Sequence, residues 1–243
     1  MVTNIWAHRG SRLHAPENTI LAFELALAAG ADGIELDVHL TADGHVVCRH
    51  DETVAVPGGG DSLIRDLTLE QVRMADVGTE LSGPLPVPML AEVFELMAPS
   101  RATLNIDIKN GPVLYEGIED ALIAAHRTSG MAERIVYSSF NHLTLVALHD
   151  REPGVSIAPL YEEALVDPWV YARHMGAEAA HPQYGTLSLP GVIDGFAAAG
   201  VAVRAWTVNE EAAMRALINA GIDTIITDDP DAALALRLDI TGR

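Results

Sequence analysis

Two pairs of charged residues stand two positions apart in otherwise apolar segments. They are Glu35 and Asp37 in the first segment, and Asp107 and Lys109 in the second. Side chains two apart on a β-strand project to the same face, so each pair points to one side of its strand. Buried carboxylates are costly unless a cation neutralises them. If the two strands are neighbours, Glu35, Asp37 and Asp107 predict a site for one hard divalent cation, Mg²⁺, Ca²⁺ or Mn²⁺.

A less specific interpretation exists for the same acids. They could lie exposed on an edge strand, or they could form ion pairs with Lys109 and Arg9. For a lone Glu-x-Asp pair this would be the better interpretation. Two such pairs on successive strands favour the metal site instead, because several acids then converge on one point.

Two histidines follow apolar segments and stand next to charged residues, His8 before Arg9 and His50 before Asp51. Either histidine alone would be typical of a structural residue. Near a metal site they predict an acid/base pair, because imidazole titrates close to neutral pH. Arg9 can bind a phosphate through two parallel donors, and Gly10 permits close approach of the backbone at this turn.

Short apolar runs alternate with helical patterns along the chain, which is typical of parallel βα units. We expect strands at residues 4–7, 34–38, 102–108, 135–139, 155–160, 178–181, 201–208 and 224–227. The clearest helices are expected at residues 16–29, 89–97, 115–126, 192–199, 210–220 and 231–238, with another beginning near residue 141. Eight strand–helix pairs favour an α/β protein with a closed (β/α)8 TIM barrel. Catalytic side chains of such barrels lie at the carboxyl ends of the strands, where the charged residues above are found.

Residues 51–87 interrupt this alternation after the second strand and are too long for a plain βα loop. The segment contains three glycines at 58–60, a predicted short helix at 69–74 and the sequence Pro84-Leu85-Pro86. One interpretation is a disordered insertion. Apolar anchors at Leu63, Ile64, Leu67 and Leu69 favour a small cap subdomain over the barrel mouth. We therefore expect one domain, residues 1–243, that includes this cap.

The amino-acid composition limits the kinds of partner that the protein can bind. The chain has 243 residues, 49% of them hydrophobic, and a formal net charge of −19. Such a charge argues against nucleic acid and anionic membranes, and it requires local cationic groups for any anionic substrate. The single cysteine, Cys48, excludes an internal disulfide. No signal peptide or bilayer-spanning run is visible, so we expect a cytoplasmic protein without stable membrane association; the oligomeric state is not predicted.

The sequence resembles the glycerophosphodiester phosphodiesterases over nearly its whole length. The amino-terminal motifs are His8-Arg9-Gly10, Ala15-Pro16-Glu17-Asn18-Thr19, Glu35-Leu36-Asp37 and His50-Asp51. The later motifs are Asn105-Ile106-Asp107-Ile108-Lys109, Ser139-Phe140-Asn141, Trp206-Thr207-Val208-Asn209 and Ile226-Thr227-Asp228-Asp229-Pro230. Their order and spacing make the resemblance specific.

The resemblance implies a role for each matching position. Glu35, Asp37 and Asp107 would be the metal ligands, although Asp107 stands where the family usually has the longer Glu. His8 and His50 would be the acid/base pair, and Arg9 and Lys109 would stabilise phosphate charge. Glu17 would orient Arg9 or His8, whereas Asn18 and Thr19 equally suit helix capping. Trp206 would form a wall against the glycerol end of the substrate, or simply pack in the barrel.

The implied reaction is metal-dependent hydrolysis of a glycerophosphodiester to sn-glycerol 3-phosphate and an alcohol such as choline or ethanolamine. Two alternatives keep the fold. A lysophospholipase D or sphingomyelinase D-like enzyme would act on a lipid, but it needs an apolar access route that the sequence does not reveal. A catalytically silent barrel that binds phosphate esters would not need the full set of histidines and acids.

Overall fold

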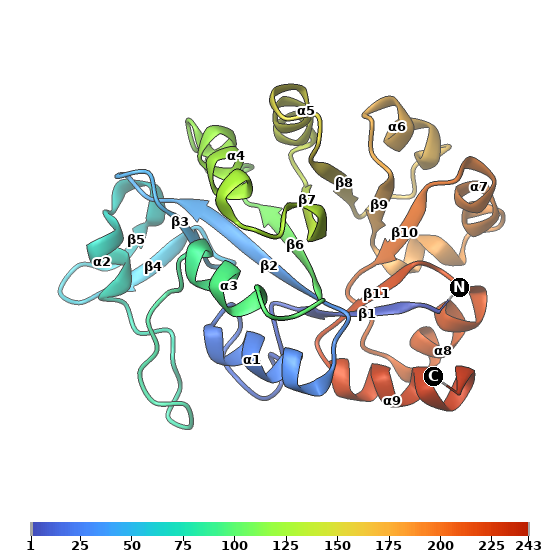
Figure 1. Ribbon diagram of the computed structural model, residues 1–243, viewed down its shortest axis with the longest axis horizontal. Helices are drawn as coiled ribbons and strands as arrows, with labels where there is room; N and C mark the ends of the chain where they lie inside the picture. Colours follow the sequence, from blue (N-terminus) through green and yellow to red (C-terminus); the bar gives the residue numbers. More distant parts are fainter. Residues whose placement is uncertain (1, 243) are drawn as a thin grey trace.

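Eight parallel strands close into a barrel in the computed structural model, which describes residues 2–242 (Figure 1). In order around the barrel they are β1 (Asn4–His8), β2 (Gly33–Leu40), β6 (Thr103–Ile108), β7 (Ile135–Ser139), β8 (Ser156–Tyr161), β9 (Ala179–Pro182), β10 (Ala202–Ala205) and β11 (Thr224–Thr227). The barrel closes because β1 pairs with both β2 and β11. The fold is the predicted (β/α)8 TIM barrel.

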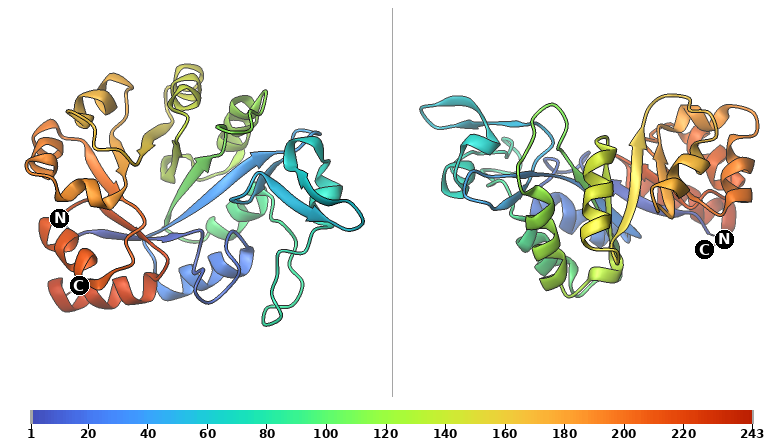
Figure 2. Two further views of the ribbon diagram at one scale, coloured as in Figure 1. Left: turned by 180° about the vertical axis from the view of Figure 1, so that it is seen from behind. Right: turned by 90° about the horizontal axis from the view of Figure 1, so that it is seen from above.

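Helices surround the barrel on its outside (Figure 2). They are α1 (Ile20–Ala29), α3 (Leu90–Met97), α4 (Ile118–Thr128), α5 (His142–Arg151), α6 (Pro168–His174), α7 (Val192–Ala199), α8 (Glu211–Ala220) and α9 (Pro230–Thr241). Short 3₁₀ turns lie at Ala132–Arg134 and Tyr184–Ser188. Among the described residues, no helix is long and apolar enough to cross a bilayer.

The predicted boundaries of α1, α4 and β10 were wrong by three or four residues. Helix α1 begins at Ile20 rather than at residue 16, because the Thr19 hydroxyl accepts the Ala22 N–H as an N-cap. Helix α4 begins at Ile118, not at Tyr115, whose side chain is buried. Strand β10 ends at Ala205, and the residues expected to extend it form the loop that carries Trp206.

The alternation of side chains along β2 separates the core from the site. Ile34, Leu36 and Val38 belong to the apolar layer between the barrel and its helices, whereas Glu35 and Asp37 have the opposite orientation. A second apolar cluster occupies the barrel interior and consists of Trp6, Val136, Ala158, Ala179 and Ile226. Each comes from a different strand, as expected for the layered interior of a parallel barrel.

Gly33 makes room for the largest of these interior side chains. It pairs with Trp6 across β1 and β2, and a Cβ atom at this position would lie 2.5 Å from the Trp6 ring. Any side chain at position 33 would therefore displace the indole at the base of the barrel.

The segment after β2 is folded. Strand β3 (Val46–Cys48) returns antiparallel to β2. The glycines at 58–60 lie at the turn of a hairpin, β4 (Thr53–Val56) and β5 (Gly60–Leu63), which was not predicted. A 3₁₀ turn (Ile64–Asp66) and helix α2 (Leu69–Arg73) follow. This segment shares a small core of its own with β3, made by Val47, Val54, Ile64, Leu67, Val72, Ala75 and Val87.

Candidate active site

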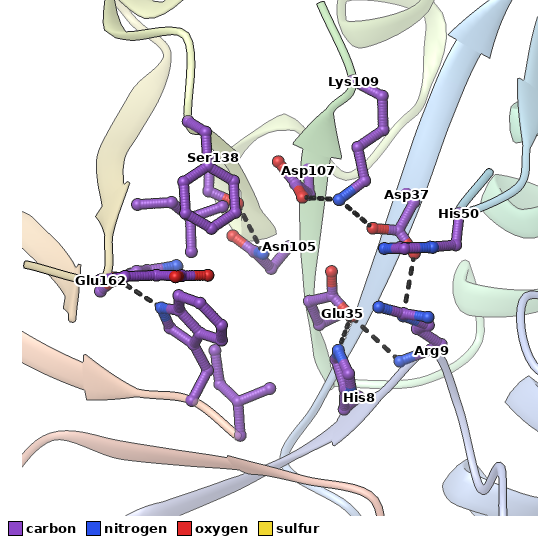
Figure 3. Close-up of a pocket in the computed structure, with 15 residues that line it drawn as sticks. His8, Arg9, Glu35, Asp37, His50, Asn105, Asp107, Lys109, Ser138 and Glu162 are labelled. Atoms are coloured by element: carbon purple, nitrogen blue, oxygen red, sulfur yellow. Dashed lines mark hydrogen bonds and ion pairs between the residues drawn. The ribbon is translucent and has the colours of Figure 1, made fainter. Parts of the chain in front are cut away.

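A cavity of about 270 Å³ opens at the carboxyl ends of the barrel strands (Figure 3). It contains the two predicted histidines, Arg9, Lys109, the three predicted metal ligands and Trp206. The full lining is His8, Arg9, Glu35, Asp37, His50, Asn105, Asp107, Lys109, Ser138, Phe140, Leu160, Glu162, His181, Trp206 and Ile226. Of the predicted site residues, only Glu17 lies outside this lining.

Strand register brings the three carboxylates together. His8 pairs with Glu35 across β1 and β2, and Asp37 pairs with Asp107 across β2 and β6. Each acid offers one oxygen such that all three lie within 4.8 Å of one another, and the residues are 6%, 1% and 3% exposed. Oδ1 of Asp107 is buried and has no hydrogen-bond partner among residues 2–242. A buried set of carboxylate oxygens with an unpaired acceptor fits a hard divalent cation.

The electrostatics of the cluster favour an added cation. Burial, followed by the charges of Asp37 and Asp107, raises the pKa of Glu35 well above its usual value. Burial also raises the pKa of Asp107 to about 6, against the opposing charge of Lys109. Asp37 is different: burial would raise its pKa, but Lys109 and Arg9 outweigh burial and lower it to about 2. Two of the three carboxyl groups are therefore short of positive charge.

Lys109 and Arg9 supply the positive charge that is present. Nζ of Lys109 lies 2.8 Å from Asp37 Oδ1 and 2.6 Å from Asp107 Oδ2. Nε of Arg9 lies 3.2 Å from Asp37 Oδ2, and the Arg9 backbone N–H donates to Glu35. The ion pairs considered from the sequence thus form, and they form within the acidic cluster rather than on an exposed edge.

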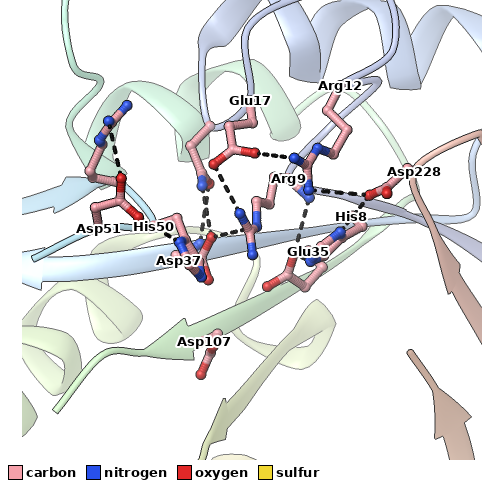
Figure 4. A network of polar contacts seen from close by, with 12 residues as sticks. His8, Arg9, Arg12, Glu17, Glu35, Asp37, His50, Asp51, Asp107 and Asp228 are labelled. Atoms are coloured by element: carbon pink, nitrogen blue, oxygen red, sulfur yellow. Dashed lines mark hydrogen bonds and ion pairs between the residues drawn. The ribbon is translucent and has the colours of Figure 1, made fainter. Parts of the chain in front are cut away.

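Glu17 and Asn18 contact different members of this group, and Figure 4 shows Glu17 beside Arg9 and Arg12. Oε1 of Glu17 accepts from Arg9 at 2.9 Å, while its other oxygen lies 2.8 Å from Arg12. Of the two partners considered for Glu17, the structure places it against Arg9. Asn18 caps no helix; its amide donates to Asp37 at 2.7 Å, and its carbonyl oxygen accepts the Asp37 N–H. Of the two capping candidates, Thr19 is the one that caps helix α1.

Gly10 is required for packing of the turn after β1. It has φ +81°, and a Cβ atom there would lie 2.7 Å from the backbone of Ala22 in α1. The close approach expected at this glycine is therefore between the turn and the helix. This packing of the turn against α1 holds His8 and Arg9 beside the other residues of the site.

His8 has a partner that the sequence did not identify. Its Nδ1 lies 2.6 Å from Oδ1 of Asp228, and its Nε2 lies 4.0 Å from Glu35. Burial lowers the pKa of His8, and the hydrogen bond to Asp228 opposes that shift. Asn209 donates to Asp228 at 2.7 Å and fixes the carboxylate. The only feature of the sequence that points to this contact is an acid, Asp228, directly after the last predicted strand.

His50 is the more open histidine, with 37% of its side chain exposed. Its Nδ1 lies 2.8 Å from Oδ1 of Asp51. Its backbone carbonyl accepts from Nε2 of His39, a residue that is fully buried and that sequence reasoning missed. Burial lowers the pKa of His39 to about 4, so this ring is neutral near pH 7.

Trp206 lines the cavity and is also packed in place. Its indole N–H donates to the backbone carbonyl of His181 at 2.7 Å, and its ring meets Phe140 edge to face at 5.5 Å. Phe140 is 49% exposed and extends the aromatic surface outward. Trp206 is thus a packing residue that also lines the cavity, and its role against the glycerol end of a substrate stays a prediction.

An apolar groove adjoins the cavity and was not predicted from the sequence. This groove has a volume of about 530 Å³ and shares Phe140 and Leu160 with the cavity. Its remaining lining is His142, Tyr161, Glu163, Leu165, Val166 and Tyr171, from the start of α5, the end of β8, the loop after β8 and α6. Val166 is 91% exposed. The structure therefore has an apolar route to the cavity, which the sequence did not reveal.

These features define a class: a TIM-barrel enzyme whose strand ends combine an acidic cation site with two histidines and two cationic side chains suited to a phosphate ester. Comparison with known proteins gives the family. The profile of the Glycerophosphoryl diester phosphodiesterase family matches residues 8–232. The chain belongs to this family and is a phosphodiesterase.

Relatives and solved structures agree with this assignment. A glycerophosphodiester phosphodiesterase of Caldanaerobacter subterraneus subsp. tengcongensis is 43% identical over 239 residues, which cover 97% of this chain and 98% of that protein. A phosphodiesterase of Oleispira antarctica, solved in complex with the product sn-glycerol-3-phosphate, superposes with a TM-score of 0.83 at 27% identity, covering 97% and 96% of the two chains. A glycerophosphodiester phosphodiesterase of Agrobacterium tumefaciens gives a TM-score of 0.82 at 27% identity, covering 96% and 99%.

Proposed function

We propose that this enzyme hydrolyses glycerophosphodiesters to sn-glycerol 3-phosphate and an alcohol, with one divalent cation, Mg²⁺, Ca²⁺ or Mn²⁺. The observation that carries the proposal is the meeting of Glu35, Asp37 and Asp107 with His8 and His50 in one cavity. The product bound to the Oleispira antarctica neighbour supports the choice of substrate.

Several charged side chains bind the phosphate, each in a different way. The three carboxylates would hold the cation, which would neutralise phosphate charge and lower the pKa of an oxygen nucleophile. Arg9 and Lys109 flank the same carboxylates and stabilise charge on the nonbridging phosphate oxygens. Glu17 orients Arg9 through its hydrogen bond. Trp206 and Phe140 form the apolar wall for the glycerol carbons.

Both histidines are engaged through Nδ1, His8 by Asp228 and His50 by Asp51. With an Nδ1–H donated to each carboxylate, the Nε2 atom of each ring exchanges protons with the substrate. One histidine takes a proton from the nucleophile, either water or the 2-hydroxyl of the substrate in a cyclic pathway. The other gives a proton to the leaving alkoxide.

The test is release of sn-glycerol 3-phosphate from glycerophosphocholine and glycerophosphoethanolamine, with each cation and with EDTA. We expect cation-dependent turnover in the wild type and its loss in His8→Ala. His14→Ala is the matched control, because the His14 side chain is 59% exposed and pairs loosely with Asp231 at 3.8 Å. Wild-type protein without turnover in any cation would overturn the proposal.

A second candidate substrate is a lysophospholipid, as in lysophospholipase D. The groove through Phe140, Leu160 and Val166 favours it, because it continues from the catalytic cavity and would cover a hydrocarbon chain. We further propose that residues 51–87 act as a cap that influences substrate choice. His50, directly before this segment, and Glu52, within it, line a second opening beside Lys109.

A further inference from the structure

His39 and Tyr115 form a buried pair next to the catalytic cavity. His39 Nδ1 lies 2.7 Å from the Tyr115 hydroxyl, and His39 Nε2 lies 3.3 Å from the backbone oxygen of His50. The two residues are 0% and 4% exposed. A carbonyl oxygen only accepts, so Nε2 carries the ring proton, and in the neutral ring Nδ1 accepts from the tyrosine hydroxyl. The chain of donors therefore runs from Tyr115 through His39 to the carbonyl of His50.

Tyr115 is itself fixed in place. Its backbone N–H donates to Asn110 Oδ1 at 2.8 Å, and Asn110 follows Lys109 directly. The Asn110 amide donates to the buried Thr144 hydroxyl at 2.9 Å, and Asn141 donates to the Asn110 carbonyl at 2.6 Å. The loop after β6 is thus rigidly placed, and through Tyr115 and His39 it contacts the loop after β3.

The His50 side chain has little else to hold it among the described residues. More than a third of that side chain is exposed, and its partner Asp51 is 60% exposed. The backbone just before it is anchored by the Arg49 N–H, which donates to the Asp37 carbonyl at 3.0 Å. The hydrogen bond from His39 is the next restraint along the chain, on the His50 carbonyl itself.

We propose that His39 and Tyr115 are positioning residues that hold the backbone of His50, and with it the imidazole, at the catalytic cavity. This inference rests on the proposed function, in which His50 transfers a proton. Neither residue lines the cavity, so neither touches the reacting atoms. Misplacement of an acid/base group by about 1 Å is enough to slow a reaction by roughly 10²-fold.

The chain offers a matched control for a test of Tyr115. Tyr137 is fully buried, and its hydroxyl lies 3.4 Å from Nδ1 of the buried His126. The ring centroids of this second pair are 5.8 Å apart, against 5.4 Å for His39 and Tyr115. Tyr137 lines neither the cavity nor the groove. Tyr115→Phe and Tyr137→Phe therefore remove the same buried hydroxyl–imidazole contact, one beside the site and one away from it.

We expect Tyr115→Phe to lower kcat by about tenfold or more with KM within about twofold, and Tyr137→Phe to leave kcat within about twofold. In a His50→Ala background, Tyr115→Phe should cause no further loss, because the group that it positions is gone. His39→Leu should lower kcat, whereas His39→Gln should retain most of it, since the glutamine amide can still donate to the His50 carbonyl. Equal kcat values for the two tyrosine variants, or an undiminished effect in the His50→Ala background, would overturn the inference.

A readout without turnover separates this inference from the proposed function. Hydrogen exchange of the backbone amides of residues 50–53 should be faster by about tenfold in Tyr115→Phe and unchanged in Tyr137→Phe. Unchanged exchange in Tyr115→Phe would count against the positioning role whether or not the wild type cleaves the substrate. If exchange is faster in Tyr115→Phe but the wild type shows no glycerophosphodiester turnover, the positioning contact stands and the proposed function is wrong.

Discussion

His8 Nδ1 lies 2.6 Å from Oδ1 of Asp228, a residue 220 positions further along the chain. The contact exists because β1 pairs with β11 and closes the barrel, so the first and last strand ends become neighbours. Asn209 then fixes the carboxylate through its amide. In the proposed mechanism, Asp228 accepts the Nδ1–H and leaves Nε2 of His8 for proton transfer, as the carboxylate of a carboxylate–histidine pair does in other hydrolases.

Asp228→Asn should therefore lower kcat/KM by roughly 10²-fold or more, because an amide can donate to Nδ1 and favour the wrong tautomer. The hydrogen bond to Asp228 raises the pKa of His8 against the effect of burial. Its loss lowers that pKa further, so the limb of the pH–rate profile that belongs to His8 should move to lower pH. Asp231→Asn, at the exposed His14–Asp231 pair, is the control. Equal rates for the two variants would show that Asp228 does not orient His8.

The part of the site that the sequence predicted depends on local rules. Side-chain alternation placed Glu35 and Asp37 on one face, and the order of βα units placed Asp107 on the neighbouring strand. The barrel itself followed from eight alternating units. Each of these inferences needs only residues that are close in sequence or on consecutive strands of the barrel.

The parts that were missed depend on contacts between distant segments. Asp228 meets His8 only once the barrel closes, and Tyr115 meets His39 across 76 positions. The β4–β5 hairpin was hidden because glycines at 58–60 resemble a loop, while its strands are only four residues long. The apolar groove combines Phe140 of the loop after β7, Leu160 of β8 and Val166 of the loop after β8, so no single segment of sequence is unusually apolar.

Cation binding should be measurable without substrate. Addition of Mg²⁺, Ca²⁺ or Mn²⁺ should raise the melting temperature of the wild type, because a bound cation offsets the repulsion among three buried carboxylates. At 100 times Kd the stabilisation is about 2.7 kcal/mol. Glu35→Gln should lose most of the shift, and Glu24→Gln, on an exposed position of α1, should keep it. Differential scanning fluorimetry with an EDTA reference measures both, and a shift that survives in Glu35→Gln would place the cation elsewhere.

His181 should make the fold sensitive to mild acid. Its ring is fully buried, and neither ring nitrogen has a hydrogen-bond partner in the part of the chain that the structure describes. Burial lowers its pKa well below 6.5. Below about pH 6.5 the unfolded chain therefore binds one more proton at this residue than the folded chain. The free energy of unfolding then falls with falling pH, by about 1.4 kcal/mol per pH unit from this residue alone.

Urea unfolding of the wild type and of His181→Leu at pH 7 and pH 5 tests this slope. The carboxyl groups titrate in both proteins and cancel in the difference. We expect the variant to gain stability relative to the wild type by about 2 kcal/mol between the two pH values, allowing for incomplete protonation near pH 6.5. A difference that stays constant with pH would mean that His181 is protonated in the folded protein.

The apolar groove predicts that the enzyme prefers substrates that carry an acyl chain. If an acyl chain lies along Leu165 and Val166, lysophosphatidylcholine gains binding energy that glycerophosphocholine lacks, at about 0.8 kcal/mol for each CH₂ group that is fully buried. Val166→Asp should then lower kcat/KM for the lysolipid by about tenfold or more and leave that for glycerophosphocholine nearly unchanged. Leu143→Asp is the control, because Leu143 is 80% exposed and does not line the groove. If Val166→Asp lowers both activities equally, or if the wild type does not cleave the lysolipid, the groove binds no acyl chain and the enzyme acts on water-soluble diesters.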